Sequence, residues 1–235
     1  MKQPDFAINL IAVGAGYARA RALFFVNFLA ATTLLLTLGG CGALPDKPVR
    51  AAMYDFGPGP LSTPATTRQA PLSPLALDEV KTAGGALDNL AVLYRLGYSN
   101  DQQLRPYALA RWSMPPAQLL GQRARDKLGQ RRVVFKAGEG LALSRSQGSL
   151  LLRLDLEEFS HFFEAPDKSV GLVRLRATVL EITPAGEKLL AQRKVIVQRP
   201  APSADAPGGV RALTAATDAA LEEIEQWLQQ VQSAR

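Results

Sequence analysis

Two stretches in the second half of the chain alternate apolar and polar residues with a period of two. Residues 150–157 alternate leucines with mainly charged side chains, and residues 173–179 alternate Val, Leu and Ala with Arg and Thr. This period is typical of strands that bury one face and expose the other. Between them, Glu164-Ala165-Pro166-Asp167 predicts a turn. The pattern therefore predicts a long antiparallel hairpin.

The alternation also predicts the register of this hairpin. If the turn pairs Phe163 with Lys168, Leu156 faces Leu175 on the buried side and Asp155 faces Arg176 on the outer side. A slip of one residue would place leucines opposite arginines, so one register satisfies both faces. We therefore expect a well-defined pairing over most of the hairpin.

The same register has an unusual consequence near the hairpin tip. It places an apolar group on the otherwise charged outer face, and this group consists of Phe159, His161, Phe163, Val170 and Leu172. Either a neighbouring element or the Pro-rich loop covers this group, or it contacts a partner or lipid. We retain these five residues as a candidate partner-contact patch.

Shorter patterns predict the remaining strands. The expected strands are residues 53–56, 75–81, 87–96, 105–112, 133–136 and 188–199, with Ser99-Asn100-Asp101-Gln102 as the turn of a hairpin. Residues 57–74 contain five prolines and predict a surface loop. The register of strand 188–199 stays open, because either Arg193 or Lys194 must face inward.

Two segments carry helical periodicity. Ser113 is a candidate N-cap for a helix that runs to Gln130 and buries Leu119, Leu120, Ala124 and Leu128, while Arg123, Arg125 and Lys127 are exposed. A second helix begins near Gly209 and has heptad-like apolar spacing, which is more typical of a docking face than of a coiled coil. The predicted fold class is α+β: a mixed, largely antiparallel sheet of about seven strands with two main helices packed on one face.

The N-terminal segment has the pattern of a secretory signal. Arg19 and Arg21 precede an apolar stretch from Ala22 to Leu38, and the last residue of this stretch is the first of Leu38-Gly39-Gly40-Cys41. These four residues resemble the bacterial lipobox, in which small residues admit a peptidase and a cysteine sulfur receives the lipid. The alternatives are a retained anchor helix and a buried structural cysteine. The expected organisation is a signal peptide over residues 1–40, a lipidated tether over 41–52 and one domain over 53–235.

Lipidation would fix where the domain works. Cleavage between Gly40 and Cys41 leaves Cys41 to carry a diacylglycerol thioether and an N-acyl chain, and several acyl chains anchor a protein stably. Bacterial lipoproteins with Asp after this cysteine tend to stay in the inner membrane, whereas this chain has Gly42. We therefore expect the periplasmic face of the outer membrane.

Composition and candidate chemistry argue against several classes of function. The net charge of +6 falls to +4 without residues 1–41, and the chain lacks the interleaved basic and aromatic residues of nucleic-acid binding. The only histidine, His161, lies between aromatic residues, and no nucleophile motif accompanies it. Glu157 and Glu158 are strand neighbours that point to opposite faces. We expect no enzyme, no catalytic residue, no metal site and no cofactor beyond the lipid on Cys41.

Several landmarks together resemble the ABC-type transport auxiliary lipoprotein family, which includes PqiC-like proteins. They are the lipobox, Tyr54-Asp55-Phe56-Gly57-Pro58, Tyr94-Arg95, Arg111-Trp112-x-x-Pro115-Pro116-x-x-Leu119-Leu120, the long hairpin, Leu190-Ala191-Gln192-Arg193 and Trp227-Leu228. The resemblance covers essentially the whole mature chain, and the Pro-rich stretch 57–74 departs from it.

The resemblance implies a non-enzymatic accessory or docking subunit of an MCE-type system that moves lipids between the two membranes. Its implied partners are a periplasmic MCE-family protein and an inner-membrane ABC permease and ATPase, and the partner set also admits a homo-oligomer. The alternative functions are a lipid carrier or chaperone with its own cavity and, ranked last, a cell-envelope hydrolase.

Overall fold

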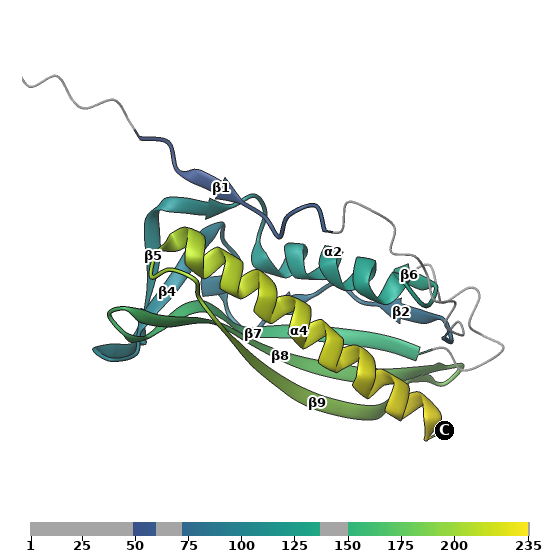
Figure 1. The fold of residues 1–235 in the computed structure, drawn as a ribbon. Helices are drawn as coiled ribbons and strands as arrows, with labels where there is room; N and C mark the ends of the chain where they lie inside the picture. The colour runs from purple at the N-terminus through teal and green to yellow at the C-terminus, as the bar shows by residue number, and fades with distance from the viewer. Residues whose placement is uncertain (1–48, 60–71, 137–149, 235) are drawn as a thin grey trace, which may run out of the picture. The chain divides into compact units, whose positions relative to one another are not determined.

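The structure is a computed structural model that describes residues 49–59, 72–136 and 150–234. The chain divides into two units, Met1–Val49 and Arg50–Arg235, and the elements below belong to the second. Within the described residues these elements are nine strands, two α-helices and a short 3-10 helix, as drawn in Figure 1. No helix in these ranges is both long and apolar enough to cross a membrane.

The central strand of the sheet is β7 (Leu150–Ala165), which pairs on both edges. One edge forms the predicted hairpin with β8 (Lys168–Thr183). Strand β8 in turn pairs antiparallel with β9 (Gly186–Pro200), so three strands of fifteen or sixteen residues form the main body of the sheet.

The other edge of β7 pairs with three short strands, one after another along its length, and all three run parallel to it. In order from the start of β7 they are β2 (Leu75–Leu77), β3 (Lys81–Thr82) and β4 (Ala91–Leu96). The strand that we predicted over residues 75–81 is therefore two separate strands. Each contributes only two or three residue pairs to the edge of β7.

Three further strands complete the sheet. They are β6 (Val134–Lys136), parallel to β2; β5 (Asn100–Trp112), antiparallel to β4; and β1 (Ala52–Tyr54), parallel to β5. Strand β5 begins earlier than predicted, because the turn lies at residues 97–99. The α+β class with a mixed sheet is confirmed, with nine described strands rather than about seven.

The two helices are α2 (Pro116–Gly129) and α4 (Ala206–Ser233), and they lie side by side over one face of the sheet in Figure 1. Helix α2 begins directly after Pro115 and has no side-chain cap, so the predicted Ser113 cap is wrong. The four residues predicted to be buried are buried. Helix α4 starts three residues before Gly209, because the Asp205 carboxylate accepts a hydrogen bond from the Gly208 amide at 2.7 Å.

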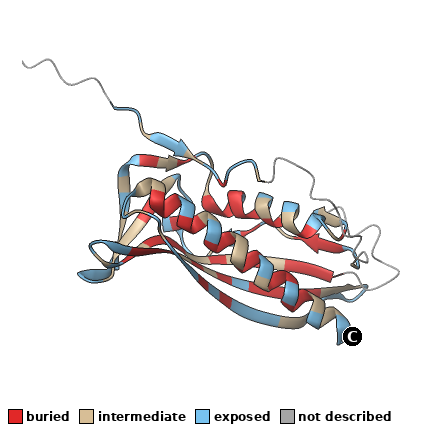
Figure 2. Cartoon of the chain, in the orientation of Figure 1, coloured by how far each residue is buried: buried red, intermediate tan, exposed pale blue. Residues whose placement is uncertain are grey.

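The core lies between the helices and the inner face of the sheet, as the buried residues in Figure 2 show. Helix α4 contributes its predicted apolar stripe, which includes Val210, Leu213, Thr217, Ala220, Ile224 and Leu228. This stripe packs on β7, β8 and β9. The heptad-like spacing therefore marks a docking face, as predicted.

The predicted register of the β7–β8 hairpin is correct for its first half. Leu156 pairs with Leu175 and Asp155 with Arg176. A bulge at Glu157 then inserts one extra residue into β7, so that Glu158 pairs with Arg174. Because side chains alternate along a strand, one extra residue turns every later side chain of β7 to the opposite face.

The bulge overturns the predicted contact patch. Phe159, His161 and Phe163 point to the helix side, where Phe159 is only 1% exposed and His161 is fully buried. Val170 and Leu172 of β8 lie on the other face, and they are buried and half-buried respectively. The five residues therefore form no common exposed surface, and the assignment of this patch as a surface is wrong.

The register of β9 resolves the open choice between Arg193 and Lys194. Arg193 pairs with Ala177 on the helix side, and its guanidinium donates to the Glu223 carboxylate of α4 at 2.7 Å. Lys194 pairs with Arg176 on the opposite side and contacts Glu157 at 3.3 Å. The inward arginine is accommodated because it lies at the edge of the sheet, within reach of an acidic residue.

Candidate functional site

The predicted lipid-attachment site lies outside the described residues. Gly40 and Cys41 belong to the segment before Val49, so the cleavage and lipidation assigned to them stay predictions. The described domain offers two other places where side chains with chemical potential gather. One is a buried centre around His161, and the other is a groove between α2 and α4.

The buried centre joins three strands through hydrogen bonds. His161 of β7 contacts the Tyr107 hydroxyl of β5 through Nδ1 at 2.8 Å and the Ser169 hydroxyl of β8 through Nε2 at 2.7 Å. Both ring nitrogens therefore have a partner. The ring also lies 4.4 Å from the Phe163 ring, measured between centroids. This arrangement satisfies the polar atoms of a side chain that the bulge at Glu157 turns into the core.

Burial controls the protonation of this centre. Removal from water disfavours the charged imidazolium and lowers the pKa of His161 from 6.5 to about 4, although the nearby Asp205 carboxylate partly opposes this shift. Burial also raises the pKa of the Tyr107 hydroxyl well above its ordinary value, and Tyr94 and Asp205 add to this effect. At neutral pH both groups are therefore uncharged.

A serine hydroxyl on a histidine suggests nucleophilic chemistry, but the geometry here is that of packing. Ser169 is buried together with His161, and α4 covers the ring. A Cβ atom added to Gly209 would lie 2.5 Å from His161 Nδ1. The hydroxyl and the ring are therefore buried beneath the first turn of α4, which packs directly on the imidazole.

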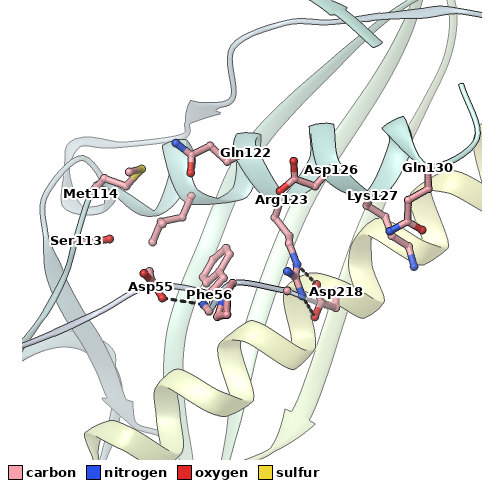
Figure 3. A pocket seen from close by; sticks show the side chains of 14 residues that line it. Asp55, Phe56, Ser113, Met114, Gln122, Arg123, Asp126, Lys127, Gln130 and Asp218 are labelled. Atoms are coloured by element: carbon pink, nitrogen blue, oxygen red, sulfur yellow. Dashed lines mark hydrogen bonds and ion pairs between the residues drawn. The ribbon is translucent and has the colours of Figure 1, made fainter. Parts of the chain in front are cut away.

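The groove lies where residues 55–59, which follow β1, run between α2 and α4, as Figure 3 shows. It has a volume of about 480 Å³. Residues 55–59 form one side, α2 forms another, and Asp218 of α4 reaches it from below. Its polar lining consists of Asp55, Ser113, Gln122, Arg123, Asp126, Lys127, Gln130 and Asp218, and its apolar lining includes Phe56, Pro58, Met114 and Leu119.

Ion pairs connect the two helices along this groove. Arg123 donates two hydrogen bonds to the Asp218 carboxylate, at 2.6 and 2.8 Å, and these bonds raise the pKa of the guanidinium. One turn further along, Lys127 Nζ lies 2.6 Å from the Glu222 carboxylate. We had predicted Arg123, Arg125 and Lys127 as exposed, but all three are half-buried. Arg123 and Lys127 are drawn over α4 by these partners. The groove is therefore charged and preorganised.

Phe56 anchors the side of the groove that residues 55–59 form. Its ring packs edge-on against Trp112 at 5.7 Å and near Phe159 at 6.1 Å, both between centroids. Gly57 and Gly59 then adopt positive φ angles of 72° and 69°, which favour glycine. These constraints hold the segment against α2.

Across the described ranges, no group of three or more His, Cys, Asp or Glu side chains is placed to hold a metal ion.

One buried ion pair was not predicted from the sequence. Arg132, directly after α2, donates to the Glu225 carboxylate of α4 at 3.0 Å, and both side chains are buried. Within the described part of the chain, Arg132 Nε and Glu225 Oε2 have no hydrogen-bond partner. No local pattern indicates this pairing, because the two residues are 93 positions apart.

Solved structures share this arrangement of helices and sheet. A protein from Xanthomonas campestris, XCC0632, superposes with a TM-score of 0.58 at 17% identity, over 79% of this chain and 95% of that chain. An uncharacterised protein superposes with a TM-score of 0.52 at 13% identity, over 76% of this chain and 99% of that chain. At these identities the likeness establishes the fold alone. No functionally curated protein matches the sequence.

The family follows from the sequence of the domain itself. Residues 54–225, which include the buried centre and the groove, match the family described as the ABC-type transport auxiliary lipoprotein component. The match covers well over half of the chain. This protein therefore belongs to the ABC-type transport auxiliary lipoprotein family, as the order of its motifs suggested.

Proposed function

We propose that this protein is an outer-membrane-anchored docking subunit of an MCE-type ABC transport system that moves lipids between the membranes. The observation that carries the proposal is the family match over residues 54–225, since an auxiliary component of a transporter is non-enzymatic in kind. Leu38-Gly39-Gly40-Cys41 supports the lipid anchor, and Gly42 supports the outer membrane. Its partners would be a periplasmic MCE-family protein and an inner-membrane permease and ATPase.

The groove between α2 and α4 is the surface that we assign to the periplasmic partner. It is hollow, it carries charges of both signs, and ion pairs and Phe56 hold its sides in place. A preformed charged surface loses little conformational entropy on binding and favours a partner with complementary charge. An acyl chain would have to bury Asp55, Asp126 and their neighbours, which disfavours the alternative of a lipid carrier at this site.

Co-purification tests this proposal. The native lipoprotein, extracted from membranes with mild detergent, should retain the MCE-family protein. Asp126→Lys, at an exposed position in the groove, should weaken retention several-fold. Asp167→Lys, the same change in the exposed hairpin turn, is the matched control. Equal retention by both variants would refute the groove assignment, and no retention by the native protein would refute the MCE partnership.

Two further measurements separate the remaining parts of the proposal. Cys41→Ser should release the protein from the outer-membrane fraction of a density gradient, and an inner-membrane position of the native protein would contradict the localisation. Mass spectrometry of the purified native chain should find only the covalent lipid. A bound, extractable phospholipid would instead support the carrier.

A further inference from the structure

One face of the sheet near β1 exposes large apolar side chains. Met53 of β1 pairs with Arg111 of β5, which pairs with Ala91 of β4, so these three side chains lie on the same face. Leu109 precedes Arg111 by two residues and shares that face. Met53 is 68% exposed and Leu109 is 53% exposed. We call this surface, with its centre at Met53, Leu109 and Arg111, the β1–β5 face.

An apolar hollow lies beside Arg111 on the same face. Its volume is about 510 Å³, and its apolar lining consists of Ala86, Leu90, Ala91, Leu93, Leu104 and Pro106. Arg111 lies at its rim, where its guanidinium donates to the carbonyls of Tyr107 and Ala110 at 2.7 and 2.8 Å. The β1–β5 face thus combines exposed apolar groups with a positioned cation, which suits a surface of apolar chains and phosphate groups.

The length of the chain before β1 limits what this face can meet. The eight peptide steps from Cys41 to Val49 span at most about 29 Å when fully extended. Helix α4, with 28 residues, is about 42 Å long, and its C-terminal end lies at the opposite end of the domain from β1 in Figure 1. If Cys41 is lipidated, the tether holds the start of β1 within about 29 Å of the bilayer, whereas it sets no such limit on the end of α4.

We propose that the β1–β5 face rests on the phospholipid surface, with Met53 and Leu109 at the boundary between headgroups and acyl chains and Arg111 at the level of the phosphates. This inference rests on the lipid anchor of the proposed function. It adds an orientation: the domain lies with one defined face on the membrane, rather than moving freely on its tether. The groove between α2 and α4 is lined by residues 55–59, Ser113, Met114, α2 and Asp218, none of which belongs to the β1–β5 face or its hollow.

Site-specific fluorescence on the full lipoprotein tests this orientation. Cys41 is the only cysteine, and its sulfur would be blocked by lipid, so a single introduced cysteine can be labelled selectively. Leu109→Cys reports on the β1–β5 face. Ile196→Cys, similarly exposed at 52% on β9 at another edge of the sheet, is the matched control. Each variant is labelled with an environment-sensitive dye and reconstituted into phosphatidylethanolamine–phosphatidylglycerol vesicles that contain nitroxide-labelled lipid.

The label at position 109 should be quenched roughly twofold or more relative to the label at 196, because only the former enters the interface. Equal quenching at the two positions, with the protein floating with the vesicles, would overturn the orientation and leave the anchor intact. If the native lipoprotein fails to float with vesicles, the anchor itself is wrong, and the orientation falls with it. The two failures are therefore distinguishable in one experiment.

Discussion

His161 of β7 and Gly209 of α4 are in such close contact that only glycine fits at position 209. A Cβ atom there would lie 2.5 Å from the imidazole Nδ1. The first turn of α4 therefore packs directly on the ring, and Asp205 caps the helix one turn earlier. This contact fixes α4 at the place where the histidine bonds to β5 and β8.

The Gly209→Ala variant should lose stability because of this contact. Overpacking of a well-filled core costs about 1–3 kcal/mol, which outweighs the gain in helix propensity. Gly129→Ala in α2 is the control, since nothing lies within 4 Å of its added Cβ. Urea denaturation monitored by Trp fluorescence gives both midpoints. A Gly209→Ala midpoint at or above that of the native chain would contradict the packing.

Stability should also fall with acidification through His161. Its folded pKa of about 4 is below the ordinary 6.5, so between these values the unfolded chain binds more protons than the folded chain. Stability conferred by the neutral histidine is therefore complete above pH 6.5 and is lost as the pH falls toward 4, by about 3 kcal/mol over the whole interval. Denaturation midpoints measured from pH 7 to pH 5 should show the start of this loss.

The His161→Gln variant separates this effect from the titration of carboxylates. It should be less stable than the native chain at pH 7 and should depend less on pH between 7 and 5. The chain has a single histidine, so an NMR titration reports on it without ambiguity. A midpoint near 6.5 in the folded protein would contradict a buried, neutral ring.

Phe159→Ser should destabilise the domain rather than weaken a surface contact. The ring packs on Phe56 and Trp112, and its removal should cost about 3–5 kcal/mol. Ile196→Ser, at an exposed position of β9, should cost far less. The two midpoints distinguish the buried position from the exposed position that we expected from the sequence. Similar, small losses in both would restore the original patch.

Because Arg132 and Glu225 form a buried ion pair, we expect a single variant and the double variant to differ in their free energy of unfolding. Glu225→Leu leaves the buried guanidinium without a charged partner, with only the neutral Gln232 side chain as an acceptor, and should cost about 3–5 kcal/mol. Combining it with Arg132→Met removes both charges and should recover much of this loss. Additive losses in the double variant would mean that the two side chains do not interact.

The sequence predicted elements whose pattern is local and repeated. Alternation over residues 150–157 and 173–179 predicted the hairpin and half of its register, because each misaligned pair would place a charge in the core. The apolar stripe of α4 was also predicted, because its apolar residues recur at helical spacing. The short strands β2, β3 and β4 were harder to predict, because their pairing with β7 depends on contacts distant in sequence.

The bulge at Glu157 explains why the candidate patch failed. A single inserted residue leaves no mark on composition, yet it reverses every side chain beyond it. One signal was present: Leu152, Leu154 and Leu156 occupy even positions, whereas Phe159 and Phe163 occupy odd positions, so the phase of the alternation changes. Read as a change of phase, the same letters would have placed His161 in the core. Lipid attachment at Cys41 remains a prediction from the four-residue pattern Leu38-Gly39-Gly40-Cys41.

The three short strands that line up along β7 also constrain the order in which the domain can form. A chain is synthesised from its N-terminus, and Leu75 must wait for Leu150 before it has a partner on β7. Residues 75–96 thus emerge long before their template, and such distant pairing is intrinsically slow. We therefore expect the short strands before α2 to stay accessible to proteases and chaperones until β7 is made, which would make the hairpin near the end of the chain the commitment step for the whole sheet.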